Sequence, residues 1–156
     1  MAWKQVNSHS KSYRMKTITF EKKIQAPIEK VWDILWNDQS YREWTKHFTP
    51  GAHYESDWET GGKILFLDAD RNGMSATITK LEKPYEVIFK HLGEVSDGKE
   101  GEPYGKGSFE KYLLQESDGF TTLTVSVDLD DEYEHVMDEG FTNGLEEVKK
   151  LAESNK

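Results

Sequence analysis

Histidines are the side chains best suited to chemistry in this sequence, and one of them is predicted to face an interior. His91 lies in phase with Val87 and Phe89, so in a β-strand all three side chains point to the same side. An imidazole there can hydrogen-bond the polar end of a ligand or carry a proton. None of the histidines has a second histidine at the i, i+4 spacing of a helical metal site. Three of the others are scattered at His47, His53 and His135.

A carboxylate and a phenol share one face of another predicted strand. Glu110 and Tyr112 are two residues apart, and either can hold a ligand hydroxyl. The sequence has no cysteine, which excludes disulfide bonds and thiolate catalysis. No serine lies in the context of a nucleophile elbow. Acid–base catalysis by an inward His, Asp or Tyr remains open.

Two segments resemble ligand-binding loops, but each lacks a residue that its motif needs. Asp68, Asp70 and Asn72 have the spacing of a calcium loop, yet Thr79 stands where that loop needs a glutamate. The glycines of residues 101–107 resemble a phosphate loop that is one residue short and has no Ser or Thr for magnesium. We therefore predict a hairpin turn at the first segment, and neither a metal nor a cofactor.

Charge and hydropathy exclude several classes of protein. The formal net charge of −9 repels a phosphate backbone, so nucleic-acid binding is not expected. Anionic membrane surfaces are disfavoured for the same reason. No apolar run approaches the roughly 20 residues of a membrane span, and the N-terminus lacks the apolar core of a signal peptide. The expected location is the cytoplasm, and the expected assembly is a monomer or a weak homodimer.

The elements that must position these residues begin with a strand and two short helices. Residues 1–15 are polar and without period, and we expect a disordered extension before one domain over 16–156. Residues 16–24 alternate as a half-buried strand. Pro27 marks the start of an amphipathic helix, and Asp38 is placed to cap a second helix that runs through Trp44.

Six further strands are predicted, followed by one long helix. Their expected ranges are 53–58, 63–69, 74–82, 85–92, 107–115 and 120–129. Asn72 and Gly73 suit a tight hairpin turn with positive φ. The glycine-rich stretch 93–107 is expected to be a mobile loop. The final helix carries a wide apolar stripe over 136–152, and Asp130 or Asp131 can cap it.

Two glycines on the stripe of that helix need an explanation. Each mid-helix glycine costs about 1 kcal/mol relative to alanine. Gly140 and Gly144 therefore indicate either a close approach of the helix to the sheet or room that is left for a ligand. Five Trp, seven Tyr and seven Phe are available to line such a space or simply to fill a core.

The order of these elements, together with several short motifs, resembles the START-like (SRPBCC) superfamily. The matching pairs are Ala26-Pro27, Val31-Trp32, Gly61-Gly62, Gly140-Phe141 and Val148-Lys149, with Trp44, Pro84 and Leu145 between them. Over residues 16–153 the chain is most similar to the branch related to the C-terminal domain of the heat-shock-chaperone ATPase activator. The resemblance implies an α+β helix-grip fold, in which a curved antiparallel sheet of about six to seven strands wraps around the long C-terminal helix.

What the resemblance implies about function is a deep pocket between helix and sheet. Members bind lipids, hormones and flavonoid-like or polyketide-like molecules, and some are aromatase/cyclase enzymes. Three functions follow as hypotheses: a binding protein for a hydrophobic small molecule, a module that modulates a chaperone, and a cyclase or hydrolase. The predicted pocket wall consists of Trp36, Trp44, Phe66, Met74, Phe89, His91, Tyr112, Val136, Met137, Gly140 and Phe141.

Overall fold

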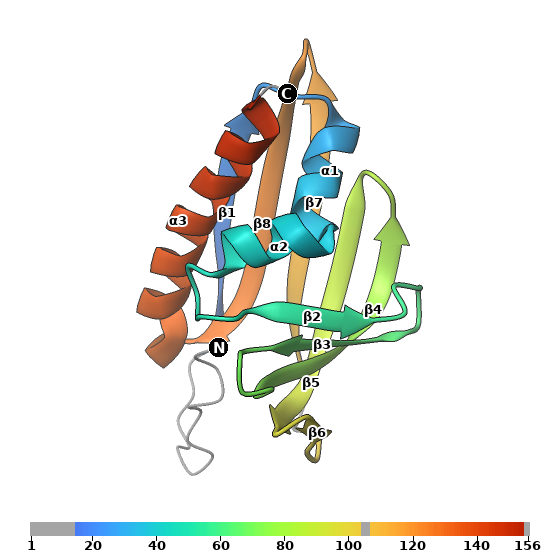
Figure 1. Ribbon diagram of the computed structural model, residues 1–156, viewed down its shortest axis with the longest axis vertical. Helices are drawn as coiled ribbons and strands as arrows, with labels where there is room; N and C mark the ends of the chain where they lie inside the picture. Colours follow the sequence, from blue (N-terminus) through green and yellow to red (C-terminus); the bar gives the residue numbers. More distant parts are fainter. Residues whose placement is uncertain (1–14, 104–106, 155–156) are drawn as a thin grey trace.

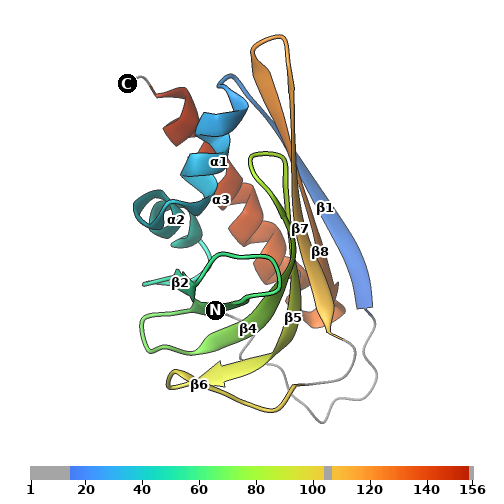
Figure 2. The same cartoon turned by 90° about the vertical axis from the view of Figure 1, so that its right-hand side faces the viewer.

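One curved antiparallel sheet forms the back of the molecule, and helices cover its concave face (Figures 1 and 2). The computed structural model describes residues 15–103 and 107–154. The elements are β1 (Met15–Ile24), α1 (Ile28–Trp36), α2 (Asp38–Thr45), β2 (His53–Ser56), β3 (Lys63–Leu67), β4 (Gly73–Glu82), β5 (Glu86–Ser96), β6 (Lys99–Glu100), β7 (Ser108–Ser117), β8 (Phe120–Asp130), η2 (Asp131–Tyr133) and α3 (Glu134–Glu153). This confirms the predicted helix-grip fold. The expected extension lies outside the described residues except for Met15, which begins β1.

The sheet is curved, and irregularities in the β4–β5 ladder contribute to its curvature. Its order is β1-β8-β7-β5-β4-β3-β2, with β6 paired only to β5. The β4–β5 ladder shifts register between Ser75 and Ala76 and again between Ile78 and Lys80. Bulges of this kind increase local twist and curvature. In Figure 1, β2 and β3 accordingly run across the long strands and close the lower end of the concave face.

Period-two burial follows the sequence pattern closely in the central strands. In β5 the buried positions include Val87, Phe89 and His91, and in β8 they run from Thr121 to Leu129 at every second residue. Thr121 is a polar residue within this buried set, and its hydroxyl donates to the carbonyl of Ala26 at 2.8 Å. His91 is one of the buried residues of β5, so the inward orientation that the alternation predicts for its side chain is confirmed.

The prediction of one loop over 93–107 was wrong in its first part. β5 continues through Ser96, turns at Asp97 and Gly98, and pairs with β6. Gly93 lies inside β5, and a Cβ there would come within 2.9 Å of the carbonyl oxygen of Glu102. This glycine therefore permits close backbone packing, which a pattern search reads as flexibility. Residues 104–106 lie outside the described ranges.

The turn between β3 and β4 is built by an aspartate, not by the predicted Asn72-Gly73 pair. Oδ1 of Asp68 accepts hydrogen bonds from the amides of Asp70 and Asn72 at 2.9 and 3.0 Å. The positive φ falls on Arg71, at 63°. Gly73 is the first residue of β4. The position takes glycine because a Cβ there would overlap the carbonyl of Phe66. The carboxylate that resembled a calcium ligand thus stabilises the hairpin.

The helix ends differ in part from the predicted caps. Asn37 is the N-cap of α2, and Asp38 is its first helical residue, bonded to Arg42 at 3.0 Å. The carboxylate of Asp130 accepts from the amide of Glu132 at 3.3 Å and so caps the short helix η2, which leads into α3. None of the helices in the described ranges is long and apolar enough to cross a membrane.

The two stripe glycines of α3 allow close packing against the α2 region rather than against the sheet. A Cβ on Gly140 would overlap the ring of Phe48, and one on Gly144 would come within 3.0 Å of the carbonyl oxygen of Trp44. The buried face of α3 consists of Met137, Gly140, Phe141, Gly144, Leu145, Val148 and Ala152. Of the two explanations left open by the sequence, close approach is the one observed, with a different partner from the one expected.

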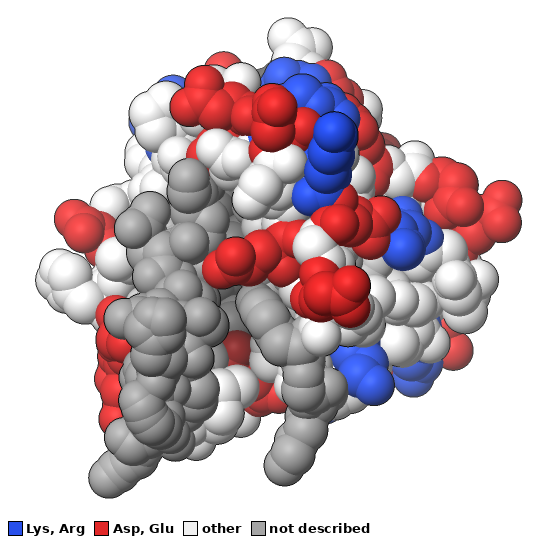
Figure 3. Space-filling view, turned by 90° about the horizontal axis from the view of Figure 1, so that it is seen from below, with Lys and Arg blue, Asp and Glu red and all other residues white. Residues whose placement is uncertain are grey.

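Charged side chains cover the outside of the fold. Figure 3 shows acidic residues spread over the lower face, with separate basic residues between them. Most ion pairs here are exposed, such as that of Lys63 with Glu100 at 3.0 Å. Exposed pairs of this kind contribute about 0–1 kcal/mol each. The fold therefore depends on its interior, and the charge governs what the surface attracts.

Replacing Gly140 by Ala tests whether Phe48 is the reason for the glycine. We expect Gly140→Ala to lower the free energy of unfolding in urea by about 1–3 kcal/mol, because the methyl group overpacks the site. In a Phe48→Ala background the same change should raise it by about 1 kcal/mol, since only the helix-propensity gain remains. Equal effects in both backgrounds would contradict the assignment.

Candidate functional site

The register of β5 and β7 brings three chemically active side chains onto the concave face. Phe89 pairs with Glu110, and His91 pairs with Ser108 in an antiparallel ladder. Residues opposite each other in such a ladder point to the same side of the sheet. His91, Glu110 and Tyr112 therefore lie together in the interior, as neighbours across and along the two strands.

Glu110 is the centre of this His–Glu–Tyr cluster. Its Oε1 lies 2.8 Å from Nε2 of His91, and its Oε2 accepts a short hydrogen bond from the hydroxyl of Tyr112. The side chains of His91 and Glu110 are only 9% and 12% exposed. Because a carboxylate can only accept, Nε2 of His91 carries the hydrogen in this arrangement. A buried carboxylate with a donor on each oxygen is stable where an unpaired one is not.

Aromatic rings surround this cluster on the helix side. Trp36, the last residue of α1, has its ring centroid 4.8 Å from that of Tyr112 and 5.5 Å from that of Phe89, in edge-to-face contacts. Phe66 from β3 lies 5.4 Å from the imidazole of His91. We call the whole set the aromatic cluster. It consists of Trp36, Tyr41, Trp44, Trp58, Phe66, Phe89 and Tyr112.

Most polar atoms of these rings have a partner within the fold. Nε1 of Trp44 donates to the carbonyl of Leu35 at 3.1 Å, and the hydroxyl of Tyr54 donates to the carbonyl of Trp36. Nε1 of Trp36 is buried and has no acceptor among the described residues, 15–103 and 107–154. The residue is 5% exposed. Buried N–H groups nearly always have an acceptor, so this one requires an explanation.

Burial keeps the phenols of this region protonated. Desolvation, reinforced by the nearby charge of Glu110, raises the pKa of Tyr112 well above its usual value. The same two causes raise the pKa of Tyr41. For Tyr54, burial and then the charge of Asp38 raise the pKa to about 12. Tyr112 is therefore a hydrogen-bond donor at neutral pH and not a phenolate base.

The structure brings together six of the eleven predicted wall residues and distributes the rest around them. Trp36, Trp44, Phe66, Phe89, His91 and Tyr112 lie in or against the aromatic cluster. Phe141 adjoins Trp44 at 6.5 Å, and Met74 pairs opposite Phe66. On α3, Met137 is buried and Val136 is only partly so. The space beside Gly140 is filled by Phe48.

Two aromatic residues of this region are absent from the predicted pocket wall. Trp58 is the last residue of the strand predicted over 53–58, and Phe48 lies between the second predicted helix and that strand. Trp58 follows β2 with a φ of 56°, and its ring lies 5.3 Å from Trp36 and 5.5 Å from Tyr54. Phe48 lies in the loop after α2 and packs 4.9 Å from Phe141. A large apolar side chain in a polar loop is the signal that pointed to them, but it does not specify a partner.

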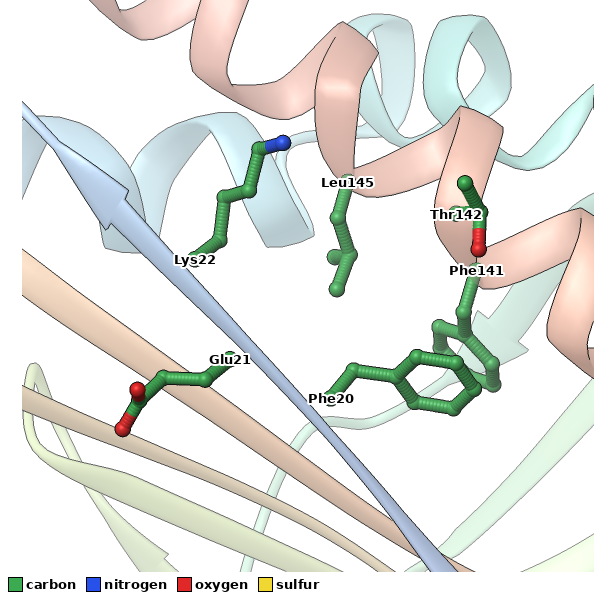
Figure 4. Close-up of a pocket in the computed structure, with 6 residues that line it drawn as sticks. All are labelled: Phe20, Glu21, Lys22, Phe141, Thr142 and Leu145. Carbon is green, nitrogen blue, oxygen red and sulfur yellow. The ribbon is translucent and has the colours of Figure 1, made fainter.

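A groove lies between the edge strand β1 and the last helix, α3. It has a volume of about 180 Å³ and is lined by Phe20, Glu21, Lys22, Phe141, Thr142 and Leu145. Figure 4 shows Phe20 and Phe141 close together at one end and the lysine toward the other. The ammonium group of Lys22 pairs with Glu146 at 2.5 Å. Over residues 15–103 and 107–154, no three His, Asp or Glu side chains are grouped so as to hold a metal ion.

An antiparallel sheet curved around a C-terminal helix, with a polar cluster inside, defines a helix-grip protein of the START-like class. Within that class, the chain belongs to the family "Activator of Hsp90 ATPase homolog 1-like protein", whose model matches residues 25–153. A search of curated proteins gave no match.

Solved structures share this fold at low sequence identity. CalU16 from Micromonospora echinospora is 17% identical, with a TM-score of 0.65 over 88% of this chain and 65% of its own. Protein CV1439 from Chromobacterium violaceum is 17% identical, with a TM-score of 0.66 over 90% and 99% of the two chains. DynU16, from the dynemicin biosynthetic locus, is 15% identical, with a TM-score of 0.68 over 90% and 48%. At these identities the likeness extends to the fold alone.

Buried tyrosines predict a loss of stability in alkali. A pKa that is higher in the folded than in the unfolded state stabilises the fold below the unfolded value, near 10, and this contribution is lost as the pH rises through the folded value. We expect the free energy of unfolding to fall between about pH 10 and 12, by up to about 1.4 kcal/mol per pH unit for each such tyrosine.

Urea unfolding at several pH values, with absorbance at 295 nm to follow phenolate formation, measures this loss. Tyr54→Phe should reduce the slope, because the pKa of Tyr54 is raised to about 12. Tyr85→Phe is the matched control, since that ring is 56% exposed. A slope unchanged by Tyr54→Phe would contradict the assignment.

Proposed function

We propose that this protein binds a hydrophobic, ring-containing small molecule against the aromatic cluster, with the ligand's polar group next to the His–Glu–Tyr cluster. The observation that carries the proposal is the partly buried carboxylate of Glu110 among aromatic rings. Burying a charged group costs stability even when it is hydrogen-bonded. A few convergent polar groups inside a mainly apolar lining are typical of ligand sites.

The hydrogen bonds of the cluster favour binding over acid–base catalysis. Both oxygens of Glu110 already accept from His91 and Tyr112, and the raised pKa of Tyr112 keeps its proton in place. A base must be able to accept a proton from its substrate, and neither Glu110 nor Tyr112 is arranged to do so. The family match and the helix-grip fold are compatible with a binding role of this kind.

Trp58 marks the route by which a ligand reaches the aromatic cluster. Its ring is partly exposed, stacks on Tyr54 and contacts Trp36 and Phe89. It belongs to the connection between β2 and β3 rather than to a strand or helix. A ring that enters from solvent can replace Trp58 against Trp36 with little change in the rest of the packing. The ligand site thus opens by movement of one side chain.

Titration with 1-tetralone, a neutral two-ring ketone, tests the proposal. A compound that binds only the folded state raises the melting temperature as its concentration increases. We expect such a rise, together with a change in tryptophan fluorescence. An unchanged melting temperature and fluorescence up to the solubility limit, for 1-tetralone and for its hydrocarbon analogue tetralin alike, would contradict the proposal.

Replacing Glu110 by Gln tests the part played by the polar cluster. The amide offers one acceptor oxygen in place of two, so one of the two groups that donate to the carboxylate must instead accept from the amide nitrogen, and the order of the site is disturbed. We expect Glu110→Gln to weaken 1-tetralone binding by about three- to tenfold in calorimetric titration, on the scale of one hydrogen bond. Glu43→Gln, at an exposed carboxylate paired with Lys46, is the control and should leave binding unchanged.

The family match favours a second candidate, a module that modulates the ATPase of Hsp90. Tyr85, in the turn before β5, and Leu113, on β7, are exposed large hydrophobic residues, at 56% and 36% exposure. They are close because the amide of Leu114 donates to the carbonyl of Tyr85 at 2.8 Å. Exposed apolar side chains that adjoin one another are typical of partner-binding surfaces.

On this second candidate, the purified chain raises steady-state ATP hydrolysis by Hsp90. The double variant Tyr85→Ser, Leu113→Ser should lose most of that effect, whereas Met15→Ser, at an exposed residue elsewhere, should keep it. Hydrolysis that does not respond to the chain would exclude this candidate without bearing on ligand binding.

A further inference from the structure

Nε1 of Trp36 is the polar atom that the fold leaves without a partner at the candidate site. Its neighbours are satisfied internally, since Nε1 of Trp44 donates to Leu35 and the oxygens of Glu110 accept from the other two members of their cluster. Trp36 is 5% exposed and its indole nitrogen has no acceptor. A buried donor without an acceptor is costly, whereas an apolar ring of similar shape would pack here without that cost.

The donor character of Nε1 of Trp36 restricts which ligand group can form a hydrogen bond with it. An indole N–H only donates, so the missing partner must be an acceptor such as a carbonyl oxygen. The partner must also be neutral, because Glu110 is bonded to Tyr112, whose ring lies 4.8 Å from that of Trp36. A carboxylate or sulfonate brought here would face that buried charge in a medium of low dielectric constant.

We propose that Trp36 Nε1 donates a hydrogen bond to the carbonyl oxygen of the bound molecule, and that the ligand is a neutral, ring-containing ketone or quinone. This inference rests on the proposed function and adds to it the ligand's polar group and the residue that recognises it. The rings around Trp36 hold the ligand's flat frame, and the N–H fixes its orientation. Hydrocarbons of the same shape bind as well but less tightly.

A matched pair of probes isolates the carbonyl. 1-Tetralone and tetralin share one two-ring frame and differ by a C=O in place of a CH₂. We expect 1-tetralone to bind the wild-type protein about tenfold more tightly in calorimetric titration, which corresponds to one buried hydrogen bond. Trp36→Phe should reduce this ratio to about one. Trp32→Phe is the matched control. It makes the same substitution one turn earlier on α1, at a residue that is 2% exposed, and should keep the affinity ratio.

Infrared spectroscopy of the wild-type complex gives a readout that needs no variant. Donation from Trp36 should lower the stretching frequency of the 1-tetralone carbonyl below its value in an apolar solvent, and a complex with Trp36→Phe should lose that shift. Circular dichroism establishes that each variant is folded. If Trp36→Phe does not fold, the affinity ratio and the carbonyl frequency of the wild-type complex still decide the question.

The possible outcomes separate this inference from the one on which it rests. Equal affinity for both probes with an unshifted carbonyl band would overturn the role of Trp36 and leave the proposed function intact; the N–H would then point to a neighbouring ring face. Failure of both probes to bind would overturn the proposed function and this inference with it. Preference for the ketone that survives Trp36→Phe would assign recognition of the carbonyl to another donor.

Discussion

The Glu110 carboxylate is the interaction on which the interior of this protein depends. A partly buried carboxylate among aromatic rings is stable when donors reach both oxygens, and here His91 and Tyr112 supply them from two strands. A slip of one residue between β5 and β7 would put His91 and Glu110 on opposite faces of the sheet and remove the hydrogen bond between them. The carboxylate therefore fixes the register at the middle of the sheet. Trp36 extends this constraint to the helices, because its ring packs on Tyr112.

The sequence predicted those parts of the fold that depend on local periodicity. Alternation in β5 placed His91 on the inward face, and the stripe of α3 was visible from residue 136 to residue 152. The errors concern contacts between distant segments. Gly93 was read as part of a mobile loop, and Gly140 as either an approach to the sheet or room for a ligand. Each one makes room for a group outside its own strand or helix, the carbonyl of Glu102 in one case and the ring of Phe48 in the other.

The candidate site was predictable in its members and not in its connections. Glu110 and Tyr112 share a strand face by simple spacing, but the hydrogen bond to His91 requires a register between two strands that no local pattern contains. Trp58 lies in a loop of polar residues, and its contact with Trp36 depends on the bend of the sheet. The burial of the Trp36 N–H likewise follows only from the assembled rings. Contacts of this kind between separate segments can be identified in the structure but not from local sequence patterns.

The pairing of β1 with β8 has a consequence for folding during synthesis. β1 is the first described strand, yet its partners are the last strand and the final helix: Met15 pairs with Asp130, and Lys22 bonds to Glu146. On the ribosome, β1 must wait until β8 and α3 have emerged, because both follow the other described strands along the chain. Contacts between such distant segments slow folding and expose strand edges in the meantime. The lysines of β1 then have a second role, because charged side chains on an unpaired strand discourage other chains from pairing with it.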